Sequence, residues 1–213
     1  MARAARGSPP HTADAMSQDP AGLKAEARQR LRDQLKRLSQ PDRASGSAAI
    51  RAILKSQPVW ESARAVLLFV PTRDEPETSP LISDALDAGK IVTLPRHVPG
   101  SDSYAACRIM NPRADLAPGR FGIPEPRPEC PIFPMNELDF VLVPGIGFAP
   151  DGGRLGRGRG YFDRLLAAVP GFKCGVAFDC QIAAGLPLEP HDVRLDCLLT
   201  PTRWHPTASH ARS

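Results

Sequence analysis

The sequence predicts an α/β fold, built as a single three-layer domain with a mixed, mostly parallel sheet and a basic N-terminal helix. Residues 65–94 have the pattern strand, helix, strand, which is typical of a parallel crossover. Residues 140–143 form a continuous apolar run, which is typical of a strand buried on both faces. A chain of 213 residues with 42% hydrophobic content can bury one core of this kind.

The two ends of the chain differ in composition from the rest. Residues 1–20 are rich in Ala, Ser, Pro and Gly, so we expect a disordered extension there. We expect the folded domain over residues 21–201 and a loose C-terminal tail over residues 202–213. The formal net charge is +4, and the surplus lies within residues 24–37. Such a local surplus favours an anionic ligand over a nucleic-acid coat.

The composition also predicts a soluble, cytoplasmic protein without a membrane partner. The chain contains no apolar run as long as a membrane span, and its N-terminus lacks the apolar core of a secretory signal. Its five cysteines have neither CxxC nor metal-ligand spacing, and an odd number cannot pair completely. We therefore expect reduced thiols.

Helices and strands are expected in a regular order along the chain. A second helix is expected over residues 44–56, and Ser79 is expected to cap a third, which starts with Pro80 and ends at Gly89. Residues 112–134 are expected to be mostly loop. Further strands are expected over residues 65–70, 90–94, 104–110, 172–178 and 193–200. The first helix has an apolar stripe at helical spacing, formed by Leu23, Ala27, Leu31, Leu35 and Leu38.

A glycine-rich basic loop separates the strand at 140–143 from a helix that runs to Pro170. Five glycines lie between residues 151 and 160, together with Arg154, Arg157 and Arg159. Glycine lets backbone N–H groups approach an anion closely, and arginine presents a planar fork of donors to phosphate or carboxylate oxygens. The order strand, loop, helix therefore favours a site for nucleotide phosphates.

Glycine spacing alone leaves two alternatives for this loop, a solvated turn and an RNA-binding Arg-Gly segment. No Gly-Lys-Ser/Thr closes the loop as in a Walker A sequence, and Gly156, Gly158 and Gly160 do not form GxGxxG. The RNA-binding alternative is disfavoured because such segments are disordered, whereas this loop lies between an apolar strand and an apolar helix.

This part of the chain resembles the 5-formyltetrahydrofolate cyclo-ligases, also called 5,10-methenyltetrahydrofolate synthetases. The signature of that family is a strand ending in Pro-Gly, a Phe, and then Arg-Leu-Gly-x-Gly-x-Gly-Tyr-Tyr-Asp. Here the strand is followed by Pro144 and Gly145, then Phe148, and residues 154–163 match the second block except at Phe162. The resemblance extends over residues 22–201 and includes the sequence Gly-Ile-Pro-Glu-Pro at 122–126, which in the family helps to form the wall of the folate site.

The resemblance implies two substrate sites. Lys24 and Arg28 match a Lys-x-x-x-Arg pair that reaches the ATP phosphates, although by itself this pair is typical of a solvated helix face. Glu75 matches a folate-binding Glu and follows a strand, although Pro76 is unusual there and acids of this segment alternatively stabilise the next helix N-terminus. The implied ATP-binding residues are Lys24, Arg28, Arg154, Leu155, Gly156, Arg157, Gly158, Arg159, Gly160, Tyr161 and Phe162. The implied folate-binding residues are Val70, Glu75, Arg157, Gly158, Arg159, Gly160 and Tyr161.

The resemblance also implies a reaction. MgATP phosphorylates the formyl oxygen of 5-formyltetrahydrofolate, N10 attacks the activated carbon, and phosphate leaves as 5,10-methenyltetrahydrofolate forms. Arg157 and Tyr161 are the implied catalytic residues, and Asp163 and Asp196 the implied Mg²⁺ ligands, with an ion pair to a loop arginine as the alternative for Asp196.

Two other functions remain open at this point. One is a nucleotide- or RNA-binding protein of the same fold without ligase activity, and the other is a phosphotransferase acting on another pterin or a thiazole-like ligand. The acidic residues favour the ligase, because an RNA-binding protein has no need of carboxylates close to a basic loop. We expect ATP and 5-formyltetrahydrofolate as ligands, no nucleic acid, and a monomer or weak dimer.

Overall fold

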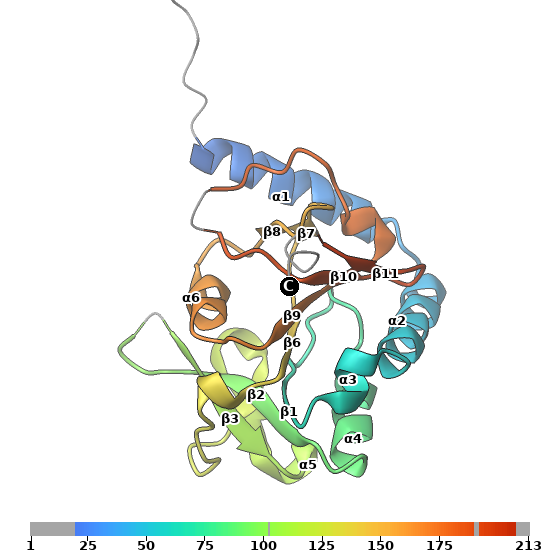
Figure 1. Ribbon diagram of the computed structural model, residues 1–213. Coiled ribbons are helices and arrows are strands. Elements are labelled where there is room, and N and C mark those ends of the chain that lie inside the picture. Colours follow the sequence, from blue (N-terminus) through green and yellow to red (C-terminus); the bar gives the residue numbers. More distant parts are fainter. Residues whose placement is uncertain (1–19, 102, 190–191, 208–213) are drawn as a thin grey trace, which may run out of the picture.

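The computed structural model describes residues 20–101, 103–189 and 192–207. Its main sheet has seven strands in the order β11-β10-β9-β6-β1-β2-β3 (Figure 1). The five inner strands run parallel, and the edge strands β11 and β3 are antiparallel to their neighbours. The predicted mixed, mostly parallel sheet is therefore confirmed. Its strands are β1 Ala65–Leu67, β2 Ile91–His97, β3 Tyr104–Ile109, β6 Phe140–Val143, β9 Phe172–Val176, β10 Cys197–Leu199 and β11 Trp204–Pro206.

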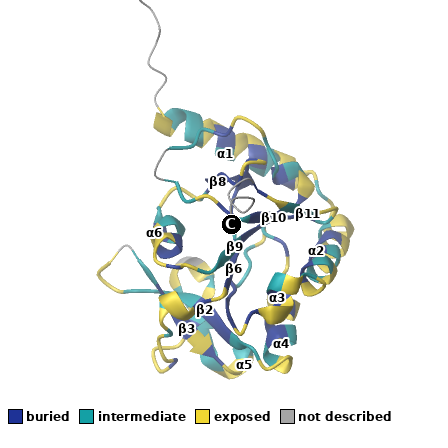
Figure 2. Cartoon of the chain, viewed as in Figure 1, coloured by how far each residue is buried: buried dark blue, intermediate teal, exposed yellow. Residues whose placement is uncertain are grey.

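Helices cover both faces of this sheet, which confirms the three layers (Figure 1). Successive side chains of β6 alternate between two cores: Phe140 and Leu142 pack with α2, α3 and α4, whereas Val141 and Val143 pack with α6. Strands β1, β6 and β10 are accordingly buried along their length (Figure 2). The helices are α1 Pro20–Lys36, α2 Gln40–Lys55, α3 Pro58–Ser62, α4 Ser79–Asp87, α5 Pro112–Asp115 and α6 Tyr161–Ala167.

Short elements fill the connections. The expectation of a loop over residues 112–134 is wrong for 112–126, where a short helix, a small two-stranded sheet and a 3₁₀ turn follow one another, and holds only for the last residues of the segment. The small strands and 3₁₀ turns are β4 Leu116–Pro118, β5 Pro124–Pro126, β7 Gly147–Phe148, β8 Arg154–Leu155, η1 Arg120–Gly122, η2 Met135–Glu137 and η3 Asp179–Gln181.

The first helix, α1, lies across the β7–β8 pair. Ala27, Leu31 and Leu35 recur every four residues and are all buried, which confirms the predicted apolar stripe at these positions. Leu23 is half-buried, and Leu38 lies beyond the end of the helix. Ala27 and Leu31 pack against a separate small core that includes Leu155. The helix approaches β7 so closely that any side chain at Gly147 would collide with Leu31. This packing brings the basic residues of α1 towards the glycine-rich loop.

Some expected details of the elements are wrong. Thr78, not Ser79, precedes α4, and its hydroxyl donates to the carbonyl of Phe69 at 2.7 Å instead of capping the helix. The tail is not loose at Trp204–Pro206, because these residues pair with β10 as an edge strand. Pro20 already belongs to α1, and the expected disorder of residues 1–19 lies outside the described residues.

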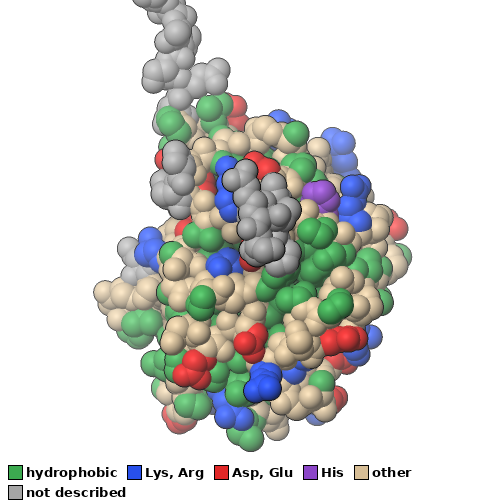
Figure 3. Space-filling view, viewed as in Figure 1, with side chains coloured by type: hydrophobic (Ala, Val, Ile, Leu, Met, Phe, Trp, Pro, Cys, Tyr) green, Lys and Arg blue, Asp and Glu red, His purple; other side chains and the backbone are tan. Residues whose placement is uncertain are grey.

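The surface of the molecule is mixed in character. Acidic and basic side chains are interspersed over the face in Figure 3. Within the part of the chain that the structure describes, every helix is too short or too polar to cross a bilayer.

Candidate functional site

A cavity of about 390 Å³ opens at the carboxyl ends of β1 and β6. These two strands are neighbours in the sheet, but the chain continues from them to opposite sides. The strand that follows β1, which is β2, pairs on one side, and the strand that follows β6, which is β9, pairs on the other. The cavity therefore lies at a topological switch point, where open α/β sheets bind their ligands. Its walls come from the segments after β1 and β6, from the glycine-rich loop, and from β2, β3 and β5.

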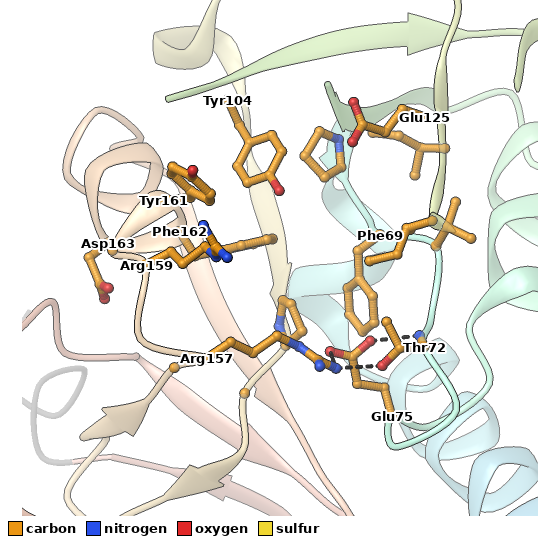
Figure 4. Close-up of a pocket in the computed structure, with 18 of the residues that line it drawn as sticks. Phe69, Thr72, Glu75, Tyr104, Glu125, Arg157, Arg159, Tyr161, Phe162 and Asp163 are labelled. Atoms are coloured by element: carbon orange, nitrogen blue, oxygen red, sulfur yellow. Dashed lines mark hydrogen bonds and ion pairs between the residues drawn. The ribbon is translucent and has the colours of Figure 1, made fainter. Parts of the chain in front are cut away.

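One wall of the cavity is aromatic. The rings of Tyr104 and Tyr161 meet edge to face with centroids 5.4 Å apart, and Phe162 lies 6.1 Å from Tyr104 (Figure 4). Burial raises the pKa of Tyr104, with Glu125 and Tyr161 adding to the shift. Its phenol is therefore neutral at physiological pH and is available as a hydrogen-bond donor. An apolar cavity with a few polar groups of this kind suits a flat, partly polar ligand.

Glu75 and Arg157 face each other across the cavity (Figure 4). A terminal nitrogen of Arg157 contacts Oε1 of Glu75 at 2.9 Å and the hydroxyl of Thr72 at 2.5 Å. The backbone N–H of Thr72 donates to Oε2 of Glu75 at 2.8 Å. The side chain of Glu75 is only 6% exposed, whereas that of Arg157 is 44% exposed. Both expected site residues therefore line one cavity, although they are 82 positions apart in the sequence.

Arg154 also lines the cavity, but its donors are turned to the protein rather than towards a phosphate. Its side chain is 4% exposed, forms an ion pair with Asp163, and donates to the carbonyl of Pro144 at 3.2 Å. Its Nε is buried without a hydrogen-bond partner. The arginine thus ties the end of β6 to α6, and two of its three nitrogens are occupied by the protein itself.

The backbone of the loop has conformations that favour glycine. Gly158 has φ 98°, and Gly160, which precedes α6, has φ 66°. Because side chains rarely adopt positive φ, these two glycines allow the chain to enter α6 directly from the loop.

The basic face of α1 meets this loop. The Nε of Arg28 donates to the carbonyl of Gly156 at 2.9 Å. Partial burial lowers the pKa of Arg28, and the nearby Arg32 lowers it further. Lys24 forms ion pairs with Glu189 and Asp192.

Neither Glu189 nor Asp192 is among the predicted site residues, although Asp192 lies four positions before the predicted Mg²⁺ ligand Asp196. Asp196 is not near the cavity. It precedes β10 at the amino end of the parallel strands, where its Oδ2 accepts the backbone N–H of Lys173 at 2.8 Å. Asp163 lines the cavity at the opposite, carboxyl end. The predicted pairing of these two acids around Mg²⁺ is therefore wrong, because the strand register separates them. Among the described residues, no cluster of three or more His, Cys, Asp or Glu side chains could hold a metal ion.

The fold and the cavity define an α/β protein with a small-molecule site at the switch point of a mostly parallel sheet. Residues 21–201 match the model of the 5-formyltetrahydrofolate cyclo-ligase family, and the chain belongs to this family. A mouse 5-formyltetrahydrofolate cyclo-ligase is 31% identical over 191 residues, covering 84% of this chain and 91% of the mouse protein. The Escherichia coli K12 enzyme of that name is 34% identical over 145 residues, covering 66% of this chain and 80% of its own length.

Solved structures support the same fold. The NMR structure of Aquifex aeolicus 5,10-methenyltetrahydrofolate synthetase superposes with a TM-score of 0.79 at 34% identity, covering 87% of this chain and 93% of that one. A 5,10-methenyltetrahydrofolate synthetase from Mycoplasma pneumoniae has the same fold at 21% identity, with a TM-score of 0.65 and coverage of 86% and 99%.

Proposed function

We propose that the protein catalyses the ATP-dependent cyclisation of 5-formyltetrahydrofolate to 5,10-methenyltetrahydrofolate, releasing ADP and phosphate in the cytoplasm. The observation that carries the proposal is the meeting of Glu75 and the arginine-glycine loop in one switch-point cavity. Membership of the cyclo-ligase family over residues 21–201 supports the choice of substrate.

The folate half of the site is assigned to the wall around β1. Glu75 offers carboxylate oxygens to the amino and ring N–H groups of a pterin, which the arginines of the loop cannot do. Its low exposure makes such hydrogen bonds stronger than they would be in water. Val70 and the aromatic wall formed by Tyr104 and Tyr161 contribute apolar surface for the ring.

The nucleotide half is assigned to the loop and α1. Arg157 and Arg159 line the cavity and suit the phosphates, together with the N–H groups of residues 155–162. Arg28 approaches from α1 and already holds the loop backbone. Lys24, on the same helix, pairs with Glu189 and Asp192, so it would have to leave these acids to reach a phosphate. Arg154 acts indirectly in this scheme, by fixing the loop and Asp163.

Catalysis then depends mainly on positioning and charge. The formyl oxygen must lie in line with the γ-phosphoryl group, and the charge that develops during transfer must be neutralised. Arg157 is suited to that role, since it is the cavity arginine that also contacts the folate side. The Tyr161 hydroxyl can orient the formyl group for attack by N10, while the aromatic wall excludes water.

Asp163 is the residue that fits a magnesium ion accompanying ATP. It lines the cavity, and its side chain is 29% exposed although Arg154 engages Oδ1. Mg²⁺ usually takes few protein carboxylates and completes its shell with phosphate oxygens and water, so one acid in this position is sufficient. The ion would neutralise phosphate charge.

The direct test is purified protein with 5-formyltetrahydrofolate and MgATP, followed by methenyl absorbance and ADP release. We expect product with the wild type and a large loss of kcat/KM for Arg157→Ala, about 2–3 kcal/mol if one charge-assisted hydrogen bond is removed. Arg108→Ala is the control, because this arginine lies outside the cavity. A folded protein that forms no methenyl product would refute the proposal and leave the two alternatives, a nucleotide- or RNA-binding protein without ligase activity and a phosphotransferase acting on another ligand.

A further inference from the structure

Thr72, Glu75 and Arg157 form a closed contact across the cavity, which we call the clasp (Figure 4). One nitrogen of Arg157 reaches both the hydroxyl of Thr72 and Oε1 of Glu75. The turn that carries the two acceptors is itself closed, because the N–H of Glu75 donates to the carbonyl of Thr72 at 3.0 Å. The clasp therefore joins the segment after β1 to the loop before α6.

The clasp occupies groups that both substrates need. Oε1 of Glu75 accepts from Arg157, and Oε2 accepts from the backbone of Thr72. Because the Glu75 side chain is only 6% exposed, a pterin can reach its oxygens through a pair of N–H groups only where Arg157 or the Thr72 backbone gives way. A phosphate that binds Arg157 through a bidentate pair of N–H groups needs the terminal nitrogen that contacts Thr72 and Glu75, and so draws it away from them. Each ligand therefore favours the open clasp.

We propose that Thr72 is a positioning residue that holds Arg157 on the folate side of the cavity, so that 5-formyltetrahydrofolate and ATP each open the clasp for the other. The proposal rests on the function proposed above. Two ligands that both select the open state bind with positive cooperativity, and the coupling is the same from either side. Its size is limited by how far the free protein favours the closed clasp.

The geometry indicates a modest coupling. Arg157 is 44% exposed, so water competes for its guanidinium and the clasp can open at little cost. Glu75 is nearly buried, so the closed state still predominates in the free protein. We expect each substrate to tighten the binding of the other about tenfold, towards the lower end of the range for coupled sites.

The test is calorimetric titration of the full chain. The nucleotide probe is adenosine 5′-(β,γ-imido)triphosphate with Mg²⁺, titrated with and without saturating 5-formyltetrahydrofolate, and then the reverse. Thr72→Val keeps the branched shape and removes the hydroxyl, so each ligand alone should bind tighter and the coupling should fall to about twofold or less. Thr72→Ser restores the hydroxyl and should restore the coupling.

Two outcomes would overturn the clasp: wild-type protein in which the two ligands bind independently, or Thr72→Val protein with wild-type coupling. A general loss of structure in the Val variant would weaken the binding of both ligands, which is the opposite of the expected tighter binding. Failure of the clasp is separate from failure of the proposed function, because wild-type protein that forms methenyl product without any coupling refutes only the clasp.

Discussion

Removing the carboxylate of Asp163 should destabilise the protein measurably, because it leaves the buried charge of Arg154 unpaired. The Arg154 side chain is 4% exposed, and its Nε already lacks a partner. Breaking a buried ion pair from one side costs about 3–5 kcal/mol. Asp163 is 29% exposed, so water offsets part of this cost. We expect Asp163→Ala to lose about 2–3 kcal/mol of unfolding free energy, which lowers the Tm of a chain of this size by about 4–12 °C.

Urea denaturation with a fitted m-value, together with a thermal melt, measures this loss. Asp163→Asn keeps an oxygen that accepts from Arg154 and should lose only about 1 kcal/mol, since the ion pair becomes a hydrogen bond between a charged donor and a neutral acceptor. The matched control is Asp33→Ala, which removes an exposed ion pair with Lys36 and should change the midpoint very little. If Asp163→Ala and Asp33→Ala have the same urea midpoint and the same Tm, the carboxylate of Asp163 does not hold Arg154. In the folded Asn variant, a higher Mg²⁺ requirement for activity would support the metal role.

Four further expectations can be tested separately. Glu75→Gln should weaken the binding of 5-formyltetrahydrofolate in calorimetry but not that of the ATP analogue, because the loosened clasp frees Arg157. Weaker binding of the analogue with unchanged folate binding would show that Glu75 serves the nucleotide. Gly175→Ala should cost about 1–3 kcal/mol in urea denaturation, because its Cβ would lie 2.7 Å from Leu195 and 2.8 Å from a ring carbon of Phe148; unchanged stability would mean that these side chains move aside freely. A thiol reagent at about pH 8 should label Cys180 alone in the native state, because the other four cysteines are buried. The labelling should be slow, because partial burial raises the pKa of the Cys180 thiol. Rapid labelling of several thiols, or labelling that persists in Cys180→Ser, would contradict this. Hydrogen bonds from the backbone N–H groups of Asn111 and Met110 lower the pKa of Asp115. The ionised carboxylate therefore stabilises the fold above the ordinary Asp pKa of about 4, and this stabilisation is lost as the pH falls through the lower pKa of the folded state. The unfolding free energy of Asp115→Asn should depend less steeply on pH in acid, and a dependence identical to that of the wild type would refute the assignment.

Local pattern was sufficient for the main architecture. The apolar run at Phe140–Val143 predicted a doubly buried strand, and the four-residue spacing of Ala27, Leu31 and Leu35 predicted the buried side of α1. These predictions succeed because burial on one or both faces imposes a period on the side chains of each element. The order of strands and helices then limited the fold to a mostly parallel sheet, whose carboxyl ends had to carry the site.

Pairings between distant segments could not be predicted in the same way. Trp204–Pro206 has no strand pattern of its own and becomes one only because β10 offers an open edge. Asp196 was misplaced because its position depends on the register of β10 against β9, and a carboxylate at the amino end of that strand cannot serve a cavity at the other end.

The sequence by itself determined two kinds of residue that line the cavity, a loop of glycines and arginines and an acid after β1. Only the tertiary structure decided which charges meet. Arg154, identical in kind to Arg157, is buried against Asp163 from the helix that follows, whereas Arg157 crosses the cavity to Glu75. The reason is that a guanidinium can pair with any carboxylate within reach, and reach is set by how the sheet and α6 pack rather than by spacing along the chain.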